Sequence, residues 1–492
     1  MESYIISIDQ STQGTKALIF DEKGSLVHRV DQFHEQIINE KGWVSHNLEE
    51  IYQNVLKVVE RLLKETQVEQ SKIRGVGISN QRETTAIWNK TTGKAIDDAI
   101  VWQCSRAQSI CQRDEIKGKG EEIQRRTGLP LSPYFPAAKM AWLLENKPVL
   151  SEEVKKEDIG LGTIDSWLVY QLTEGKSYKT DYSNASRTQL FNLHTLTWDE
   201  EICEMFGIDH NLLPEVCDSD SCFGFTDFGG LLTEGIPIHG VLGDSHSALF
   251  GQGCLEKGQT KCTYGTGSSI MMNIGEQLVL SENGIASSLA WKIGGRAQYV
   301  LEGNLNYTGA VITWLKDDLK LIKSAAETEE LAKSARSDDS LYLVPAFSGL
   351  GAPYWDSNAA AAYIGMTRTT KKAELVRAAL ESIAYQITDI LTAMSKDAGI
   401  EVKDVRVDGG PTRNKYLMEF QSNLSNILVQ VPTAEELSAM GVAYLAGITL
   451  GIYTENVLKL MEVSIYKSNM DEAVRNKKIE GWLRAVDLVL TK

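Results

Sequence analysis

Two short segments rich in Gly, Ser and Thr, about half the chain apart, carry residue types that bind phosphate. Residues 9–16 directly follow the apolar run 4–8, and residues 263–269 directly precede the apolar run 270–272. Small residues let backbone N–H groups come close to an anion, and hydroxyl groups add further donors. One such segment in each half of the chain predicts two similar domains that hold one phosphate chain between them.

Two carboxylates follow strand-like apolar runs, where they suit metal binding or proton transfer. Asp9 can hold Mg²⁺ beside nucleotide phosphates, directly or through water, and capping of the turn is the alternative. Asp244 follows residues 236–242 and can take the proton of a hydroxyl group during phosphoryl transfer. His246 is the alternative base, although a His at this position is more often a structural residue at a helix start.

An Arg and a Glu stand side by side after the apolar run 73–79. Arg82 and Glu83 offer a fork of donors and a carboxylate acceptor to a polyhydroxylated ligand, and a surface ion pair is the alternative. A later turn, residues 408–410, suits a nucleotide lying against the backbone, but a lone Gly-Gly pair is weak evidence.

Hydrophobic spacing predicts the elements that position these side chains. Short apolar runs flank the first Gly-rich segment, residues 51–64 have helical spacing, and residues 73–79 form a strand. The second half repeats this order, which is typical of an α/β fold. We therefore predict two α/β domains, residues 1–252 and 253–492, divided where glycines interrupt the pattern. The second half should hold strands at 260–264, 268–273 and 405–407, and helices at 309–321, 373–398, 414–424, 439–450 and 479–490.

Composition excludes several classes of protein. The chain has 492 residues and a formal charge of −16, which argues against non-specific binding of nucleic acid or of an anionic membrane. It has no apolar run long enough to span a membrane. Its seven cysteines lack metal-site spacing, and with no signal peptide they indicate reduced thiols and a cytoplasmic location.

These segments together resemble the FGGY family of carbohydrate kinases, and within it the glycerol kinases, essentially from end to end. The resemblance implies two actin-like, ribonuclease H-like α/β domains around an ATP cleft. It also implies ATP-dependent phosphorylation of a terminal hydroxyl of glycerol or a related small polyol. The matching segments are residues 80–85, 101–104, 134–142 (Tyr-x-Pro-x-x-Lys-x-x-Trp), 180–188, 264–267, 349–356, 374–381 and 408–410.

The resemblance also implies roles by position, with Asp244 as the general base. ATP and Mg²⁺ are the implied cofactors, and Asp9 is the expected metal ligand. A homodimer or homotetramer is compatible with the family. The residues expected at the β- and γ-phosphates are Thr12, Gln13, Gly14 and Lys16; those expected to hold the rest of the nucleotide are Thr266, Gly309, Thr313, Gly410 and Asn414. The polyol pocket is expected to contain Arg82, Glu83, Trp102, Tyr134, Asp244, Ser245 and Ser269.

Two departures from the glycerol kinases lie in the expected polyol pocket. Ser245 stands where they carry a Gln, and Ser269 stands where they carry a Phe. Losing a Phe vacates apolar volume, and Ser adds a hydroxyl. The sequence therefore favours, as an alternative to glycerol, a longer tetritol, pentitol or ketose.

Two further expectations concern other functions. An actin-like ATPase without a sugar substrate would use the same phosphate segments, but it would not need residues 80–85, Trp102 or Tyr134. Residues 228–235 match a loop where some glycerol kinases bind fructose bisphosphate through an Arg. Here Gly235 takes that position beside the anionic Glu234, and the loop has no His to phosphorylate. We predict regulation by neither route.

Overall fold

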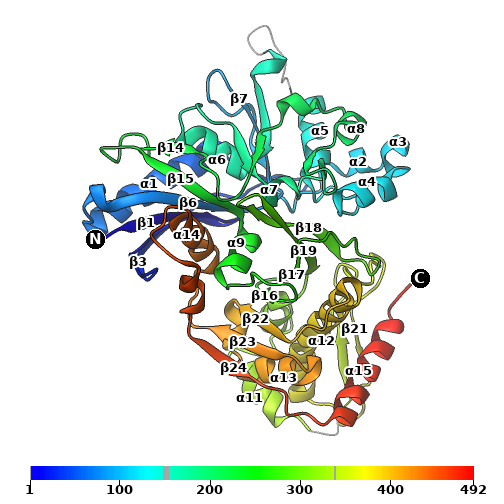
Figure 1. Cartoon of the computed structure of the whole chain (residues 1–492). Helices are drawn as coiled ribbons and strands as arrows, with labels where there is room; N and C mark the ends of the chain where they lie inside the picture. The colour runs from blue at the N-terminus through cyan, green and yellow to red at the C-terminus, as the bar shows by residue number, and fades with distance from the viewer. Residues whose placement is uncertain (1, 148–154, 337–339, 492) are drawn as a thin grey trace.

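The computed structural model describes residues 2–147, 155–336 and 340–491. It has two α/β halves, one above the other in Figure 1. The sheet of the first half has the order β14-β15-β6-β1-β2-β3. Strands β1, β2 and β3 form an antiparallel meander, and β6 and β15 run parallel to β1. The strands are β1 (Tyr4–Gln10), β2 (Gly14–Phe20), β3 (Leu26–Phe33), β6 (Ile73–Asn80), β14 (Gly224–Thr226) and β15 (Ile236–Gly243).

The sheet of the second half repeats this arrangement, with the order β18-β19-β17-β16-β22-β23-β24. Here β16, β17 and β19 are antiparallel neighbours, and β22 and β23 run parallel to β16. The fold class predicted from the sequence, two actin-like α/β domains, is confirmed. The strands are β16 (Thr260–Tyr264), β17 (Ser268–Gly275), β18 (Ala286–Ile293), β19 (Arg296–Leu305), β22 (Asp404–Asp408), β23 (Leu428–Pro432) and β24 (Val463–Tyr466).

Helices cover the sheets with the apolar faces that the sequence predicted. Helix α1 (Leu48–Thr66) buries residues at helical spacing, among them Ile51, Val55 and Leu62, and the Asn47 side chain caps its first turn. In the second half, α12 (Lys372–Ala398) and α13 (Lys415–Ser425) cover one face of the sheet. The helix predicted at residues 309–321 is α10 (Gly309–Thr313) followed by a π-helical turn, Trp314–Asp318.

Helix α14 (Leu437–Thr449) connects the halves in a way the sequence did not indicate. It follows β23 of the second sheet, but it packs on β1, β6 and β15 of the first sheet and on α9 (Asp244–Gly251), as Figure 1 shows. Glycine makes this close packing possible, because a Cβ at Gly77 would lie 2.4 Å from the Val442 carbonyl oxygen. The core around α14 includes Ile5 of the first sheet and Val300 of the second.

A five-stranded sheet in the first half contains the strand that leads directly to Trp102. Its order is β4-β5-β8-β7-β9, with bounds β4 (Ile37–Ile38), β5 (Val44–His46), β7 (Thr85–Asn89), β8 (Ala99–Ile100) and β9 (Ile159–Thr163). The remaining elements are α2 (Gln108–Cys111), α3 (Asp114–Lys117), α4 (Gly120–Thr127), α5 (Pro136–Asn146), α6 (Ile164–Leu172), α7 (Tyr182–Ala185), α8 (Glu200–Met205), α11 (Glu327–Ser334), α15 (Glu472–Asp487), β10 (Lys179–Asp181), β11 (Phe191–Asn192), β12 (Thr197–Trp198), β13 (Glu215–Cys217), β20 (Tyr342–Val344) and β21 (Ala362–Ile364).

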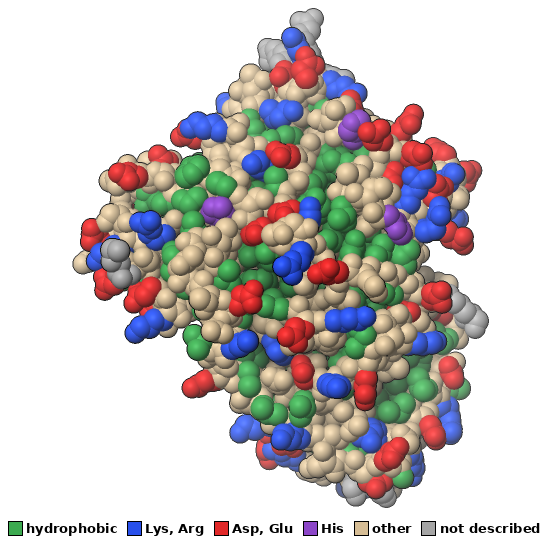
Figure 2. Space-filling model, viewed as in Figure 1, with side chains coloured by type: hydrophobic (Ala, Val, Ile, Leu, Met, Phe, Trp, Pro, Cys, Tyr) green, Lys and Arg blue, Asp and Glu red, His purple; other side chains and the backbone are tan. Residues whose placement is uncertain are grey.

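The visible surface (Figure 2) carries charges of both signs, and the cysteines are free. On the face shown in Figure 2, Lys and Arg side chains are dispersed among Asp and Glu. Each of the seven cysteines is free. Within the described ranges, no helix has the length and apolar character needed to cross a membrane.

Candidate active site

The first phosphate loop is the tight connection between β1 and β2. The Ser11 N–H donates to the Gly14 carbonyl at 2.8 Å, and a Cβ at Gly14 would lie 2.6 Å from the Gln32 carbonyl oxygen. Thr12 is half-buried and Gln13 is exposed. The Trp102 indole N–H donates to the Thr12 hydroxyl at 2.9 Å, so the loop lies beside the predicted polyol pocket.

Asp9 and Lys16 are paired across the β1–β2 hairpin that carries this loop. Lys16 Nζ lies 3.6 Å from Asp9 Oδ2 and 2.8 Å from Glu436 Oε2. Asp9 Oδ1 is buried, with no hydrogen-bond partner in the described part of the chain. Burial raises the pKa of Asp9, and the Lys16 charge opposes that rise. Among the described residues, Asp9 therefore keeps one carboxylate oxygen without a hydrogen-bond partner.

The second phosphate loop, residues 265–267, connects β16 and β17. The Gly265 N–H donates to the Gly267 carbonyl at 2.7 Å, and the Gly309 N–H donates to the Gly265 carbonyl at 2.9 Å. A Cβ at Gly267 would lie 2.1 Å from the Leu305 carbonyl oxygen, so only glycine fits. Thr266 is exposed at the tip. The start of α10 thus packs directly against this loop.

The turn after β22 borders the second loop. Gly409 has φ of +98°, and a Cβ there would lie 2.0 Å from the Tyr264 carbonyl oxygen. Gly410 has open space where a Cβ would be, so its backbone is accessible to a ligand.

Two further residues predicted to hold the nucleotide lie on nearby helices. Thr313 is exposed on α10. Asn414 caps α13 by accepting from the Leu417 N–H at 3.0 Å, and its amide nitrogen donates to Thr328 at 2.9 Å. The Asn414 side chain is therefore already engaged on both sides.

Four buried charged residues form a cluster at the centre of the site. Arg82 donates two hydrogen bonds to Glu302, at 2.8 and 2.7 Å. Arg187 Nε donates to Glu83 at 2.6 Å, and Arg187 Nη1 lies 3.0 Å from Glu302 Oε2. Burial raises the pKa of Glu302, but the guanidinium groups outweigh it and hold the pKa well below its usual value. Because Glu302 lies on β19, this four-charge cluster joins the two halves.

Asp244 is the first residue of α9 and lies next to this cluster. Its Oδ1 is 3.3 Å from Arg82 Nε and accepts from the Ser245 N–H at 2.6 Å. About a third of its side chain is exposed (35%). Burial raises the pKa of Asp244, Arg82 opposes the rise, and the charges of Glu83 and Asp9 add to it. Asp244 thus combines an accessible oxygen with a raised proton affinity.

The remaining predicted polyol residues form a polar floor and an aromatic wall. The Ser269 hydroxyl lies 3.4 Å from the Ser245 hydroxyl and 3.3 Å from Glu302 Oε1. The rings of Trp102 and Tyr134 meet edge to face, with centroids 5.7 Å apart. The structure therefore places Ser245 and Ser269 beside Asp244 and the four-charge cluster. Tyr134 lies within the electrostatic reach of Glu83, and Trp102 packs against Tyr134.

His246 does not have the properties of the alternative base. It is fully buried, and neither ring nitrogen has a hydrogen-bond partner in the described residues. Burial and the nearby Arg82 charge lower its pKa well below the usual value. The ring is therefore neutral and lies beneath the surface that a substrate can reach.

Three residues of the site had no role in the sequence interpretation: Arg187, Lys261 and Glu302. Lys261 is fully buried on β16 and donates to the Thr263 hydroxyl at 3.0 Å. Burial lowers its pKa, and Asp408 opposes this. Lys261 and Glu302 are ionisable residues inside strands that are otherwise largely buried, and that signal could have identified them.

Comparison with known proteins places this geometry in a family. Residues 4–251 match the N-terminal domain of the FGGY family of carbohydrate kinases, and residues 260–450 match its C-terminal domain. The chain belongs to the FGGY family of carbohydrate kinases. It is therefore a carbohydrate kinase, and this family implies the use of ATP.

Relatives of this FGGY kinase match along the whole chain. Glycerol kinase 1 of Thermotoga maritima is 46% identical over 99% of this chain and 100% of its own length. The glycerol kinase of Bacillus licheniformis is 43% identical over 99% of both chains. The crystal structure of Plasmodium falciparum glycerol kinase with ADP has a TM-score of 0.93 and 36% identity, covering 100% of this chain and 99% of that one.

This FGGY kinase offers few protein ligands to a metal ion. No group of three or more His, Cys, Asp and Glu side chains within the described residues could hold one. Mg²⁺ at a nucleotide site is usually bound by one or two carboxylates together with waters and phosphates. Asp9, with its buried and unpaired Oδ1, fits that mode.

Proposed function

We propose that this FGGY kinase transfers the γ-phosphoryl group of ATP to a terminal hydroxyl of glycerol or a related small polyol. The observation that carries the proposal is the position of Asp244, accessible at the start of α9 and 3.3 Å from the buried Arg82. Glu83 belongs to the adjoining four-charge cluster, and the Trp102–Tyr134 ring pair supplies the aromatic wall of the proposed polyol pocket. Relatives named glycerol kinase over the full length support the same reaction.

In the proposed reaction, the substrate hydroxyl oxygen attacks the γ-phosphorus and its proton passes to Asp244. The bond between the γ-phosphorus and the bridging oxygen breaks, and ADP leaves. A carboxylate with raised pKa suits this proton transfer, because it holds the proton more readily than an exposed Asp. Arg82 keeps the Asp244 carboxylate oriented, and the four-charge cluster keeps Arg82 in place.

The two loops would hold the phosphate chain between them. The first loop, with Thr12, Gln13 and Gly14, would donate N–H groups to the β- and γ-phosphates, and Lys16 would add positive charge. Lys16 currently contacts Glu436, so its approach to a phosphate requires that this pair loosen. When bound, Mg²⁺ would neutralise phosphate charge, and Asp9 is the residue that would hold it.

The rest of the nucleotide would lie along the second sheet. We assign its binding to the exposed Thr266 and Gly410, the loop contact Gly309, and Thr313 and Asn414 on the neighbouring helices. Both polar groups of the Asn414 side chain are engaged, so its contribution would be to hold the start of α13 in place.

A second candidate substrate is a longer tetritol, pentitol or ketose. Ser245 and Ser269 place two small hydroxyls 3.4 Å apart, and Ser269 also reaches Glu302. These two hydroxyls can form a hydrogen bond with an additional hydroxyl of a longer substrate. Glycerol would lack the apolar contact that a Phe in place of Ser269 would provide. This arrangement is the observation that favours the longer substrate.

The experiment is an ADP-release assay with a panel of glycerol, tetritols, pentitols and ketoses at saturating ATP and Mg²⁺. Polyol-dependent turnover supports the proposed function, and the ratios of kcat/KM decide between glycerol and a longer chain. A much higher kcat/KM for glycerol than for every longer compound would overturn the second candidate. ATP turnover that ignores every polyol would instead indicate an actin-like ATPase.

We also propose that the functional halves divide at residues 252 and 253 and that the enzyme works in the cytoplasm. The family matches end at residue 251 and resume at residue 260, and α9 ends at Gly251. This boundary divides the chain in sequence, although α14, which lies beyond it, packs on the first sheet. Seven free cysteines support a reducing compartment.

A further inference from the structure

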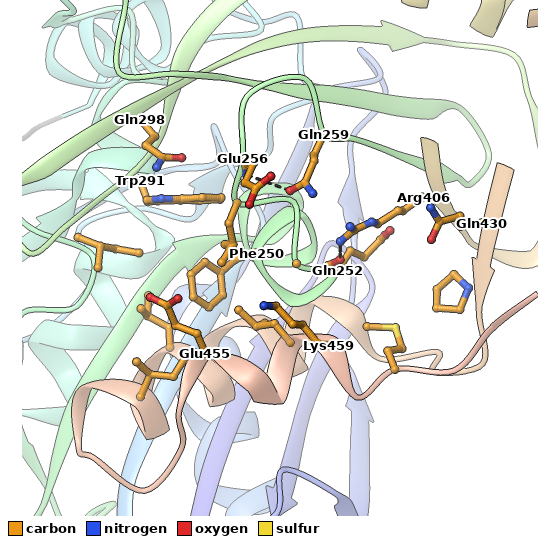
Figure 3. A pocket seen from close by; sticks show the side chains of 18 of the residues that line it. Phe250, Gln252, Glu256, Gln259, Trp291, Gln298, Arg406, Gln430, Glu455 and Lys459 are labelled. Atoms are coloured by element: carbon orange, nitrogen blue, oxygen red, sulfur yellow. Dashed lines mark hydrogen bonds between the residues drawn. The ribbon is translucent and has the colours of Figure 1, made fainter. Parts of the chain in front are cut away.

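A cavity lies between the two halves at the C-terminal end of α9, whereas Asp244 lies at the N-terminal end of that helix. Its volume is about 760 Å³, within the range of about 300–1,000 Å³ that is typical of small-molecule sites. Phe250 and Gln252 of α9 and its following turn line it, together with residues from β18, β22, β23 and the segment after α14 (Figure 3). We call it the hinge cavity.

The hinge cavity exists because the second sheet lacks a helix over part of one face. On β22, Val405 and Val407 point into the core beneath α12 and α13, so Arg406 between them faces the other way. Arg406 is paired in register with Gln430 on β23, and both line the cavity. The helix that follows β23, α14, packs on the first sheet, and therefore leaves these two side chains uncovered.

One wall of the cavity is made of side-chain amides. In two of them the oxygen is used: Gln259 Oε1 accepts from the Glu256 N–H at 2.9 Å, and Gln298 Oε1 accepts from Asn273 at 2.7 Å. Their NH₂ groups have no acceptor among the described residues. Gln252 Oε1 is buried and unpaired among the described residues. Figure 3 shows Gln298, Gln259, Gln252 and Gln430 arranged around the space.

The other lining groups point to an uncharged occupant. Three cationic side chains are nearly balanced by two carboxylates: Arg296, Arg406 and Lys459 against Glu256 and Glu455. A balanced lining gives no strong preference for an ion. The apolar part of the lining is supplied by branched, aromatic and Met side chains, among them Leu458 and Met461.

We propose that the hinge cavity binds an uncharged small molecule with one hydrogen-bonding edge and one apolar face, and that this binding regulates the nucleotide site. That chemistry is shared by a sugar ring and a nucleoside. Amides are donors and acceptors at once, which suits hydroxyl groups and base edges alike.

Gln252 connects the hinge cavity to the nucleotide side of the second sheet. Its backbone carbonyl accepts from Arg406, and its side-chain nitrogen donates to Asp408. Asp408 ends β22 and is followed directly by Gly409 and Gly410, the turn assigned to the nucleotide. An occupant that shifts Gln252 therefore shifts the start of that turn.

The cavity also contacts the two segments that lead into the second sheet, one that follows α9 and one that follows α14. Gly253 and Glu256 belong to the first connection, and Glu455 and Lys459 belong to the second. Relative movement of the two halves must change the conformation of these segments, so an occupant that bridges them favours one relative arrangement of the halves. Because coupling between two binding sites is reciprocal, ADP and the occupant must change each other's affinity by the same factor.

The test is isothermal titration calorimetry on the full chain, with D-glucose and uridine as separate probes. We expect at least one probe to bind, and which one binds tells the sugar source from the nucleoside source. Met461→Trp should fill the cavity and weaken binding by about tenfold or more, equivalent to about 1.4 kcal/mol. The matched control is Leu460→Trp, because Leu460 is 68% exposed and is not part of the lining.

A second variant, Gln430→Leu, removes one amide from the wall and should also weaken the probe. The proposal fails if neither probe binds, or if inorganic phosphate binds more tightly than both. It also fails if binding is unchanged in Met461→Trp and Gln430→Leu, or if ADP displaces the probe completely, since the probe would then occupy the nucleotide cleft. The regulatory part fails if a bound probe leaves the affinity for ADP unchanged. None of these readouts depends on the identity of the polyol substrate.

Discussion

Replacing Glu302 with Gln tests the four-charge cluster, because it removes one charge and preserves the shape. The Glu302 carboxylate receives two hydrogen bonds from Arg82 at 2.8 and 2.7 Å and lies 3.0 Å from Arg187. Its side chain is fully buried. In the native cluster two cations face two anions, with Asp244 beside Arg82 at its edge. In Glu302→Gln the two buried cations keep only Glu83 and the partly exposed Asp244 as anionic neighbours.

Breaking a buried ion pair by removing one partner costs about 3–5 kcal/mol. The Gln amide oxygen can still accept one hydrogen bond from Arg82, so we expect a loss near the lower limit, about 3 kcal/mol. Urea unfolding followed by tryptophan fluorescence measures this loss. Glu381→Gln is the matched control, because Glu381 is a buried carboxylate away from the site that accepts from Tyr416 at 2.6 Å.

A second readout separates a role in the site from a purely structural one. With Glu302 neutral, the Arg82 charge acts more strongly on Asp244, which stabilises the Asp244 anion and lowers its pKa. A base works deprotonated, so the acid limb of the kcat profile should move to lower pH in Glu302→Gln and stay in place in Glu381→Gln. The reasoning is refuted if Glu302→Gln costs less than about 1 kcal/mol, the scale of an exposed pair, and leaves the acid limb unmoved.

Four further predictions can be checked with the same assays. Asp244→Asn should lower kcat by about 10²–10⁴-fold with polyol binding largely kept, and a near-native rate would exclude Asp244 as the base. Ser269→Phe should improve the use of glycerol relative to longer polyols by no more than about 1–3 kcal/mol in kcat/KM, and an unchanged ratio would contradict the pocket assignment. Burial lowers the pKa of Lys139 from 10.5 to about 7. Between pH 7 and 10.5 the unfolded chain therefore binds more protons than the folded chain, so the free energy of unfolding rises with pH. Lys139→Met should remove that rise, which urea unfolding midpoints measured across this pH range can show. Fructose bisphosphate should not inhibit, because Glu234 is exposed in the loop where it would bind, and inhibition that maps to this loop would contradict the prediction.

Much of the fold was predictable because its signals are local. The β1–β2 hairpin, the helical spacing in α1 and the long apolar helix α12 each follow from residues that are near one another in the chain. The phosphate loops were predictable for a related reason, since a tight turn next to a strand needs small residues at fixed positions. Gly14 and Gly267 bear this out, because a Cβ at these positions would lie 2.6 and 2.1 Å from a backbone carbonyl oxygen.

Other features depend on contacts between distant residues, which no local pattern encodes. The bond between Arg82 and Glu302 joins residues 220 positions apart, and neither residue has a neighbour in sequence that identifies the other. The same holds for α14, whose apolar residues show that it is buried but not which sheet buries it.

The sequence by itself determined the strands and helices around the two phosphate loops, the duplicated α/β plan and the residue types available for phosphate and polyol chemistry, because these follow from spacing and side-chain type. Only the tertiary structure decided which charges pair and which side chains remain accessible. It placed Glu302 between two arginines, left Asp244 partly exposed while burying His246, and opened the hinge cavity by packing α14 on the first sheet. The physical reason is that pairing and burial depend on the packing of the two halves against each other.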